Sequence, residues 1–335
     1  MERYPKFTVS IPVYNSSRYL AGCLKSIRGQ DYPKDKIEVV VADGGSTDNT
    51  VEIARDSGAR VYNNLKRLGD YGAKVVAEHA TGELLVVFAA DNELVGKDWL
   101  RRVAEVFAAY PRVAALWGRI VSGRNDARIN KYYALIQSDP MSHFINKNLD
   151  YYFKRNPVSR SPSVGDHFLF DVMPDRQLCW GANGLVYRLD LVKDIILRSE
   201  YVGDNEVFQY MTESGNNRVA YLPDLKTAHH HIDSIRGWAG KWKRNLTTLF
   251  FAHAQERRVD WAFRQRFKLK LVFWLIYSLF FPISLLHSVF LALRERTAYW
   301  LYHPLMCFIQ TFVYVVYTLK QRNGLKILFN YGSPR

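Results

Sequence analysis

The feature that most constrains the fold is an alternation of short, apolar, β-branched segments with longer amphipathic ones over the first 90 residues. Each apolar segment ends at polar turn residues, as buried strands do. Strands are expected at 6–12, 37–42, 60–62 and 84–88, with helices at 17–28, from residue 50 and at 71–80. This order predicts an α/β fold with a mostly parallel sheet, right-handed crossovers and helices on both faces.

Polar residues directly follow three of the expected strands. Asn15, Asp43 and Asp91 each come just after an apolar run. Ligands of open parallel sheets bind beyond the carboxyl ends of the strands. We therefore expect these three side chains to share one rim of the sheet.

Composition and charge exclude several classes of protein. The 335 residues are 48% hydrophobic and 23% charged, which is ordinary globular usage and excludes disorder and collagen-like repetition. Three cysteines without metal-ligand spacing support neither a disulfide framework nor a zinc finger. The formal charge of +14 is concentrated in residues 231–335, which hold 16 basic and 4 acidic residues. A nearly neutral body argues against nucleic-acid binding.

The last third of the chain predicts membrane contact. Residues 271–293 and 300–319 contain no Asp, Glu, Lys or Arg, and each reaches the roughly 20 residues that cross a bilayer. Basic residues on both flanks predict a hairpin of two transmembrane helices with its ends in the cytoplasm. Because Pro282, His287 and Pro304 interrupt these segments, a re-entrant or interfacial pair is the alternative, as is a buried hairpin at a homo-oligomer interface.

The expected organisation has four parts. Residues 1–231 form the catalytic domain, 232–270 basic amphipathic juxtamembrane helices, 271–319 the membrane hairpin and 320–335 a cytoplasmic tail. Trp238, Trp242, Leu246 and Leu249 recur at helical spacing among basic residues, which suits a helix on an anionic membrane surface. The N-terminus has no signal-peptide pattern, so the catalytic domain is expected on the cytoplasmic side of the cell membrane.

Several motifs together resemble the family 2 glycosyltransferases, which are inverting enzymes of the GT-A fold that use nucleotide sugars. The resemblance covers residues 7–231 and rests on SIPVYNSSRYLAGCLKSI, VVVADGGSTDNT, GELLVVFAADNE, WGANGLVYR and GDNEVFQYMTESG. The QxxRW pattern of processive synthases is absent. The resemblance implies a nucleotide-diphosphate sugar donor, bound by Pro12, Tyr14, Asn15, Asp43, Lys74, Asp91 and Asn92.

Asp43 and Asp48 have different expected roles. A carboxylate accepts hydrogen bonds, which suits Asp43 to the base or ribose of a nucleotide. The alternative for Asp43 is an Asx-turn. Asp48 fits a helix-capping role better, because it stands just before a predicted helix.

A metal site is implied at Asp91, which aligns with the second carboxylate of the family's DxD motif. Ala89 replaces the first, so this sequence departs from the pattern. Mg²⁺ or Mn²⁺ bound there would neutralise the departing diphosphate. By the same resemblance, His229 aligns with a histidine position of the family that would supply a further metal ligand. Capping of a helix by Asp91 and a purely structural His229 are the alternatives.

The resemblance implies that Asp204 is the catalytic base, and Glu206 is the second candidate. Asp204 would take the proton from an acceptor hydroxyl, whereas the alternative is a helix N-cap. The sugar and acceptor are assigned to Trp180, Gly181, Ala182, Asn183 and Glu206, although Trp180 also suits a buried position.

The expected function is transfer of a sugar to a lipid-linked glycan at a membrane. The apolar tail indicates the lipid, and the expected base indicates a hydroxyl nucleophile, because a polyprenyl phosphate is already ionised. The alternatives are a polyprenyl-phosphate sugar synthase and, because of Ala89, a nucleotide-sugar-binding subunit with weakened catalysis.

Overall fold

The chain forms two compact units in this computed structural model, which describes residues 4–178, 183–199, 201, 203–256 and 267–330. The first unit comprises Met1–Val121, Leu149–Pro174 and Trp180–His230. The second unit comprises Ser122–Asn148, Asp175–Cys179 and His231–Arg335. The compact units do not follow the expected division at residue 231, because residues 122–148 and 175–179 group with the C-terminal helices, and the functional division of the chain stays a prediction.

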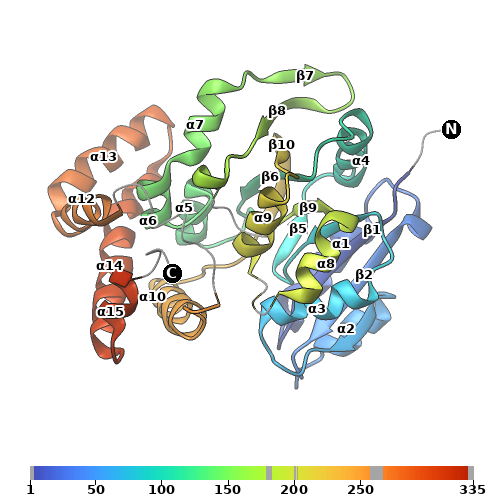
Figure 1. Cartoon of the computed structure of the whole chain (residues 1–335), viewed down its shortest axis with the longest axis horizontal. Helices are drawn as coiled ribbons and strands as arrows, with labels where there is room; N and C mark the ends of the chain where they lie inside the picture. The colour runs from blue at the N-terminus through green and yellow to red at the C-terminus, as the bar shows by residue number, and fades with distance from the viewer. Residues whose placement is uncertain (1–3, 179–182, 200, 202, 257–266, 331–335) are drawn as a thin grey trace. The chain divides into compact units, whose positions relative to one another are not determined.

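A ten-stranded mixed sheet forms the centre of the first unit (Figure 1). Its order is β3-β2-β1-β4-β9-β6-β10-β8-β7, with β5 paired to β10. The strands are β1 Phe7–Val13, β2 Ile37–Asp43, β3 Arg60–Asn63, β4 Leu84–Val87, β5 Asn92–Leu94, β6 Ala115–Val121, β7 Ser159–Ser161, β8 Gly165–Asp171, β9 Leu185–Arg188 and β10 Arg218–His229.

The first four strands are mutually parallel. β1 pairs with β2 and β4, and β2 pairs with β3, all in the same direction. β9 then runs antiparallel between β4 and β6, which makes the sheet mixed. The sequence prediction is confirmed for this half, and the carboxyl ends of β1, β2 and β4 meet at one edge, called here the carboxyl edge.

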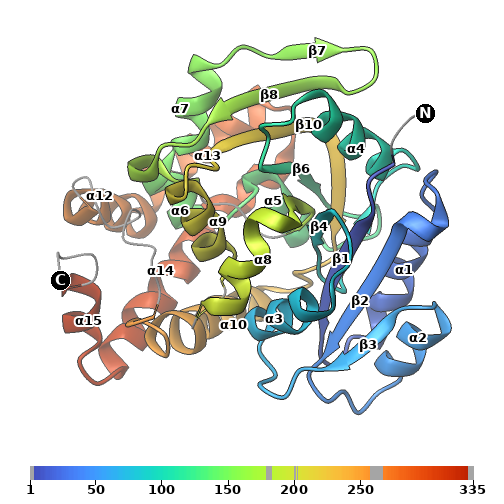
Figure 2. The same cartoon turned by 45° about the vertical axis from the view of Figure 1, so that its right-hand side comes forward.

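Helices cover both faces of the parallel half. Figure 2 shows α3 and α8 on the opposite side of β1 from α1. The helices of this unit are α1 Ser17–Arg28, η1 Lys34–Lys36, α2 Thr50–Asp56, α3 Gly69–His79, α4 Trp99–Ala109, α7 Asn148–Arg155, α8 Leu189–Arg198 and α9 Asp204–Glu213. α7 begins one residue before the unit boundary, at Asn148.

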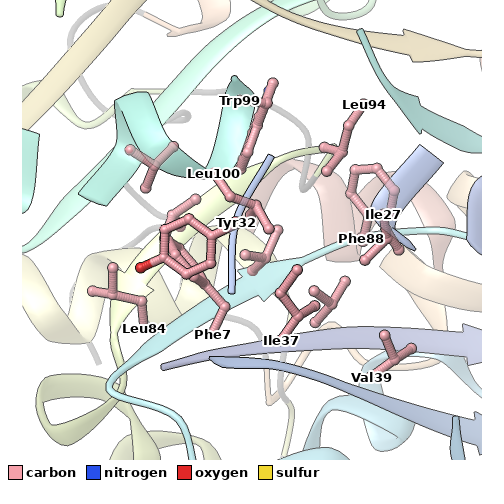
Figure 3. Packing of buried hydrophobic residues seen from close by; sticks show 14 of the residues in the cluster. Phe7, Ile27, Tyr32, Ile37, Val39, Leu84, Phe88, Leu94, Trp99 and Leu100 are labelled. Carbon is pink, nitrogen blue, oxygen red and sulfur yellow. The ribbon is translucent and has the colours of Figure 1, made fainter. Parts of the chain in front are cut away.

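The core of the first unit lies between α1, α4 and the sheet (Figure 3). α1 contributes Leu20, Leu24 and Ile27, which recur at helical spacing and are all buried. Phe7 and Trp99, from β1 and α4, are fully buried in the same cluster. Burial of each such side chain contributes roughly 1.5–3 kcal/mol relative to exposure, so this packing holds the sheet rigid behind its edge.

The second unit is helical. Its members are α5 Arg128–Ile136, α6 Pro140–Asn146, α10 Ile235–Arg244, a π-helical turn η3 Asn245–Phe251, α12 Phe267–Leu279, α13 Phe281–Arg294, η4 Ala298–Tyr302, α14 His303–Lys320 and α15 Gly324–Asn330. The short helix η2, Pro174–Arg176, crosses the unit boundary.

The apolar face of α10 packs inside the second unit. Trp238 is 0% and Trp242 3% exposed, and the Trp238 Nε1 donates to the Met306 carbonyl of α14 at 3.2 Å. α10 is amphipathic as expected, but the expected contact of its tryptophans with a membrane is wrong. Helix α14 supplies an apolar surface for them, so no lipid is needed to cover these rings.

The expected membrane hairpin is not confirmed. Among the described residues, no single helix has the length and apolar character needed to cross a bilayer. One pair passes that test together, Lys268–Leu279 with Phe281–Arg294, but its two helices are bent by 83° relative to each other.

Candidate functional site

The loops that follow β1 and β2 are locked together at the carboxyl edge. Asn15 has a left-handed backbone (φ 46°), its amide donates to Ser46 Oγ at 2.9 Å, and its Oδ1 accepts from the Thr47 amide at 2.8 Å. Ser16 donates its amide to Thr50 Oγ1 at 2.7 Å. The two loops therefore form one preorganised polar rim, as the spacing of Asn15 and Asp43 predicts.

Asp48 caps the two helices that leave this rim. Its carboxylate accepts from the Thr50 amide of α2 at 3.1 Å and the Ser17 amide of α1 at 3.2 Å. The hydrogen bond from the Thr50 hydroxyl is the main cause that lowers its pKa to about 2. Asp48 therefore has a structural role at the helix starts as expected, although the N-cap residue of α2 is its neighbour Asn49.

Asp43 is buried at the end of β2 and shapes its own loop. Its carboxylate accepts from the amides of Gly45 and Ser46 at 3.0–3.2 Å and from the Ser46 hydroxyl at 2.5 Å. This is the Asx-turn geometry considered as its alternative. Each carboxylate oxygen has two lone pairs, so the turn leaves acceptor capacity, and nucleotide binding by Asp43 stays a prediction.

Aromatic and basic side chains flank the same rim. Tyr14 is exposed and the Arg67 guanidinium lies 5.9 Å from its ring centre. Lys66 and Lys74 lie 3.9 and 5.8 Å from the ring centre of Tyr71, at the start of α3. Lys74 therefore belongs to a cationic cluster beside the rim, where an anionic ligand is favoured. Pro12, the remaining donor candidate here, lies within β1 in register with Ala42.

Asp91 and His229 meet at the end of β4. The Asp91 Oδ2 lies 3.4 Å from the His229 Nε2, with the Asp91 side chain 20% and the His229 side chain 6% exposed. β5 pairs antiparallel with β10, so that Asn92 stands opposite His229, and the Asp91 carbonyl accepts from the His230 amide at 2.8 Å. This backbone pairing brings together two residues that lie far apart in the sequence.

Asn92 and Asn183 form a part-buried hydrogen bond next to this pair. Asn92 is fully buried and its Nδ2 donates to the Asn183 Oδ1 at 2.9 Å. The Asn92 Oδ1 has no hydrogen-bond partner among the residues that the structure describes. Gly184, directly before β9, has φ +82°, and a Cβ there would lie 2.6 Å from the Thr227 hydroxyl, so glycine allows this backbone conformation and close packing against Thr227.

The residues at the end of β4 fit a divalent cation. Two ligands of one ion at about 2.1 Å each lie roughly 3 Å apart when they are at right angles, close to the Asp91–His229 separation. A carboxylate oxygen suits Mg²⁺ or Mn²⁺, and the added imidazole nitrogen favours the transition metal Mn²⁺ over Mg²⁺. The Asp91–His229 pair lies wholly within the first unit.

α1 supports the metal-binding pair from behind. The Tyr19 ring stacks with His230 at 6.0 Å, and the Cys23 Sγ lies 3.6 Å from the Ala89 carbonyl. Burial, followed by the charges of Asp91 and Glu93, raises the pKa of the Cys23 thiol. Sequence reasoning missed Tyr19 and Cys23, although the helical spacing of α1 places both near the strand ends.

Asp204 is the first residue of α9. Gly203 is the N-cap residue, so the capping role considered for Asp204 is wrong by one position. Burial, followed by the charge of Asp204, raises the pKa of the Tyr187 phenol on β9. Glu206 is 1% exposed, and its Oε2 would lie 2.1 Å from a Cβ at residue 203, so glycine is required there.

Three expected sugar-site residues lie outside the described residues: Trp180, Gly181 and Ala182. Of that segment, the structure describes Asn183, which contacts Asn92. It therefore brings together Asp91, Asn92, Asn183 and His229, and separately Asn15 with the Asp43 loop. The base assignment of Asp204 stays a prediction.

Comparison with protein families identifies a domain at the N-terminal side. Residues 8–168 match the family described as Glycosyl transferase family 2. This region contains the locked loops and Asp91, whereas His229 and Asp204 lie beyond it.

Two curated relatives are glycosyltransferases by name. One, from Methanococcus voltae, is "Dolichyl N-acetyl-alpha-D-glucosaminyl phosphate 3-beta-D-2,3-diacetamido-2,3-dideoxy-beta-D-glucuronosyltransferase", 28% identical over 40% of this chain and 45% of its own length. The other, Glycosyltransferase AglE of Haloferax volcanii, is 38% identical over 29% of this chain and 34% of its own length. The chain spans less than half the length of these two relatives.

A solved structure shares the fold. The mannosyltransferase PcManGT from Pyrobaculum calidifontis, in complex with GDP-Man and Mn²⁺, aligns with a TM-score of 0.52 and 18% identity, over 92% of this chain and 86% of its own. The α/β fold is therefore GT-A-like. The match of residues 8–168 to the family 2 glycosyl transferases and the named relatives together support a glycosyltransferase.

Proposed function

We propose that the chain moves a sugar, with inversion, from a nucleotide-diphosphate sugar to a hydroxyl of a lipid-linked glycan at a membrane. The observation that carries the proposal is the Asp91–His229 pair, 3.4 Å apart at the end of β4 and beside the buried Asn92. A carboxylate and an imidazole at the carboxyl edge suit a cation that meets a diphosphate.

The donor nucleotide is assigned to the locked loops. Asn15 and the Asp43 turn hold the rim in a fixed shape, so little ordering cost remains when a nucleotide binds. Exposed Tyr14 offers a flat apolar face for a base. Lys74 and its basic neighbours attract the diphosphate.

Asp91 and His229 would hold Mg²⁺ or Mn²⁺ when it is bound, and the cation would supply charge neutralisation for the departing diphosphate. The glycosyltransferase whose structure shares the fold is itself described with GDP-Man and Mn²⁺. Asn92 and the β5–β10 pairing fix the direction of the two ligands, which is what preorganised charge stabilisation requires. Ala89 leaves Asp91 as the sole carboxylate of the DxD position.

Asp204 is proposed as the general base. Its carboxylate would remove the proton from the acceptor hydroxyl while that oxygen forms a bond to the anomeric carbon and the bond to the diphosphate breaks on the opposite face. General-base assistance contributes about 10²–10⁴-fold. A phosphate acceptor is already ionised, so its transfer would not need this carboxylate.

A lipid-linked acceptor is supported from two directions. The name of the Methanococcus voltae relative describes transfer to a sugar that is joined to dolichyl phosphate. In this chain, residues 271–293 and 300–319 are apolar and uncharged, and the basic flanks suit the cytoplasmic face of a membrane.

The test compares two classes of acceptor with the Asp204→Asn variant. Detergent-solubilised full chain is supplied with radiolabelled nucleotide sugars, Mn²⁺ and either a lipid-linked glycan or a polyprenyl phosphate, and the label in the organic phase is measured. The proposal expects a 10²–10⁴-fold loss of kcat with the glycan acceptor. Asp190→Asn, which changes an exposed acid in the first turn of α8, is the matched control.

Three results would contradict parts of the proposal. Unimpaired glycan extension by Asp204→Asn removes the base assignment. Transfer to polyprenyl phosphate alone makes the chain a polyprenyl-phosphate sugar synthase. Nucleotide binding without transfer or hydrolysis for any donor would show a binding subunit instead of an enzyme.

A further inference from the structure

The helices α12, α13 and α14 have an inverted distribution of polar and apolar residues. On α13, Leu286 and Leu293 are 73% and 74% exposed, whereas Ser284 and Ser288 are fully buried. On α14, Gln310 is fully buried while Phe312 is 58% exposed. Helices of water-exposed proteins show the opposite arrangement, so this surface is built for an apolar surrounding.

The buried polar groups satisfy one another inside these helices. The Thr311 hydroxyl donates to Ser278 Oγ at 2.9 Å, and the Ser288 hydroxyl donates to the Trp300 carbonyl at 2.5 Å. The Gln310 Nε2 donates to Asp139 Oδ1 at 2.8 Å. Hydrocarbon offers no hydrogen bonds, and polar side chains in lipid must therefore pair within the protein as these do.

Neither helix of the α12–α13 pair is long enough to cross a bilayer alone, and the pair is sharply bent. Lys268–Leu279 has 12 residues and Phe281–Arg294 has 14, which at 1.5 Å per residue gives about 18 and 21 Å against a hydrocarbon core of about 30 Å. Pro282 stands in the first turn of α13, where its missing amide ends the preceding helix, and the two axes differ by 83°.

Charged residues stand at both outer ends of the α12–α13 pair, and the bend between the two helices contains none. Lys268 and Lys270 stand at the start of α12, and Arg294 and Arg296 at the end of α13, where Arg294 also pairs with Glu295 at 2.6 Å. The bend itself consists of apolar residues that are 46–56% exposed, namely Leu279, Phe280 and Phe281. An apolar tip between two cationic ends matches one anionic membrane surface.

We propose that α12 and α13 enter a single leaflet of an anionic membrane as a bent wedge, with Phe280 and Phe281 deepest and both charged ends at the same surface. This replaces the expected transmembrane course of residues 271–293. It rests on the proposed function in one respect, since the wedge would hold the chain at the membrane that contains the lipid-linked acceptor.

Topology in sealed vesicles is the first test. Lys268→Cys and Arg294→Cys are made singly in a background carrying Cys179→Ser, because the described native cysteines, Cys23 and Cys307, are buried. Full-length protein is bound from outside to vesicles containing anionic lipid and treated with an impermeant maleimide. The wedge predicts equal labelling of both positions before and after vesicle lysis. Labelling of one position only after lysis would show crossing and overturn the proposal.

Binding to the same vesicles is the second test. Phe281→Asp should weaken flotation with the vesicles at least tenfold, since a charge at the tip is costly in hydrocarbon. Val158→Asp is the matched control, because Val158 is 51% exposed in the first unit and should leave flotation unchanged. Thermal unfolding of each variant checks folding.

Each remaining outcome decides the proposal. Unchanged flotation of a folded Phe281→Asp variant would overturn the wedge. Dimerisation of the chain without lipid that Phe281→Asp abolishes would also overturn it, because this result would assign the apolar surface to contact with a second copy of the chain. Sugar transfer in detergent is measured in parallel. Failure of vesicle binding with transfer intact rejects the wedge alone, whereas loss of transfer with vesicle binding intact rejects the proposed function alone.

Discussion

Two carboxylates at opposite edges of the parallel sheet, Glu38 and Asp91, have contrasting surroundings. At the amino edge, Glu38 of β2 is surrounded by donors: the hydroxyls of Thr8 and Thr81 at 2.8 and 2.5 Å, and the cationic groups of Arg60 and Lys6 at 2.8 and 3.3 Å. Every one of these partners comes from the protein itself. Glu38 therefore joins β1, β2, β3 and the turn before β4.

At the carboxyl edge, Asp91 faces His229 and keeps 20% of its side chain exposed. Its neighbour Asn92 is buried with one side-chain oxygen unpartnered among the described residues. An edge that holds the sheet together satisfies its charges internally, whereas an edge that binds a ligand keeps acceptors available for it. Mutations at the two edges should accordingly separate activity from stability.

The largest effect is expected for Asp91→Ala. Loss of the proposed metal ligand removes several kcal/mol of charge stabilisation, which corresponds to about 10²–10³-fold in kcat, with an unchanged free energy of unfolding. The measurement is transfer kinetics in Mn²⁺, with the exposed Asp56→Ala on α2 as control. Full activity of the Asp91 variant would remove the distinction between the edges.

His229→Ala should have a smaller effect of the same kind. Asp91 would remain as a ligand, so we expect a loss of about 10–100-fold that is partly recovered at high Mn²⁺ concentration. Titration of activity with Mn²⁺ gives the apparent metal affinity. A loss that no metal concentration changes would assign His229 a structural role.

Glu38→Gln should act on stability alone. Replacement of the charge weakens charge-assisted hydrogen bonds at the amino edge and should lower the free energy of unfolding by about 1–3 kcal/mol. Urea unfolding of the two proteins at neutral pH measures the difference. Activity per folded molecule should not change, and a change in kcat would show that the edges are coupled.

The smallest effect is a pH dependence at the amino edge. Burial acts to raise the pKa of Glu38, but hydrogen bonds from Thr81 and Thr8 and the charge of Arg60 outweigh it and hold the pKa at about 2, below its ordinary value of 4.5. The unfolded chain binds the proton first, so the stabilisation is complete above pH 4.5 and is lost as the pH falls toward 2.

Urea unfolding between pH 5 and pH 2.5 follows this loss. The gap in stability between wild type and Glu38→Gln should narrow as the pH falls, and a constant gap would contradict the assigned shift.

The sequence predicted the parallel half well because each element there is local. Strands expected at 37–42 and 84–88 appear as Ile37–Asp43 and Leu84–Val87, and the polar residues that follow them lie at one edge as topology requires. The Asn92–Asn183 hydrogen bond and the pairing of β5 with β10 could not be predicted. They depend on contacts between segments about 90 and 135 residues apart, which carry no local periodicity.

The C-terminal region shows the limit of hydropathy alone. The run at residues 271–293 is apolar enough to cross a membrane, but Pro282 divides it, and the bend of 83° depends on how α12 and α13 pack with α14. The prediction that Trp238 and Trp242 contact a membrane was wrong for a related reason. An amphipathic pattern identifies an apolar face but not what covers it, and here α14 covers it.

Mn²⁺ binding in the presence of a nucleoside diphosphate tests the central claim most directly. Electron paramagnetic resonance of free Mn²⁺ during titration of wild type and Asp91→Asn gives both affinities without any acceptor or turnover. We expect one Mn²⁺ per wild-type chain and an affinity at least tenfold weaker in Asp91→Asn. Equal affinities in two folded proteins would show that the end of β4 does not hold the metal.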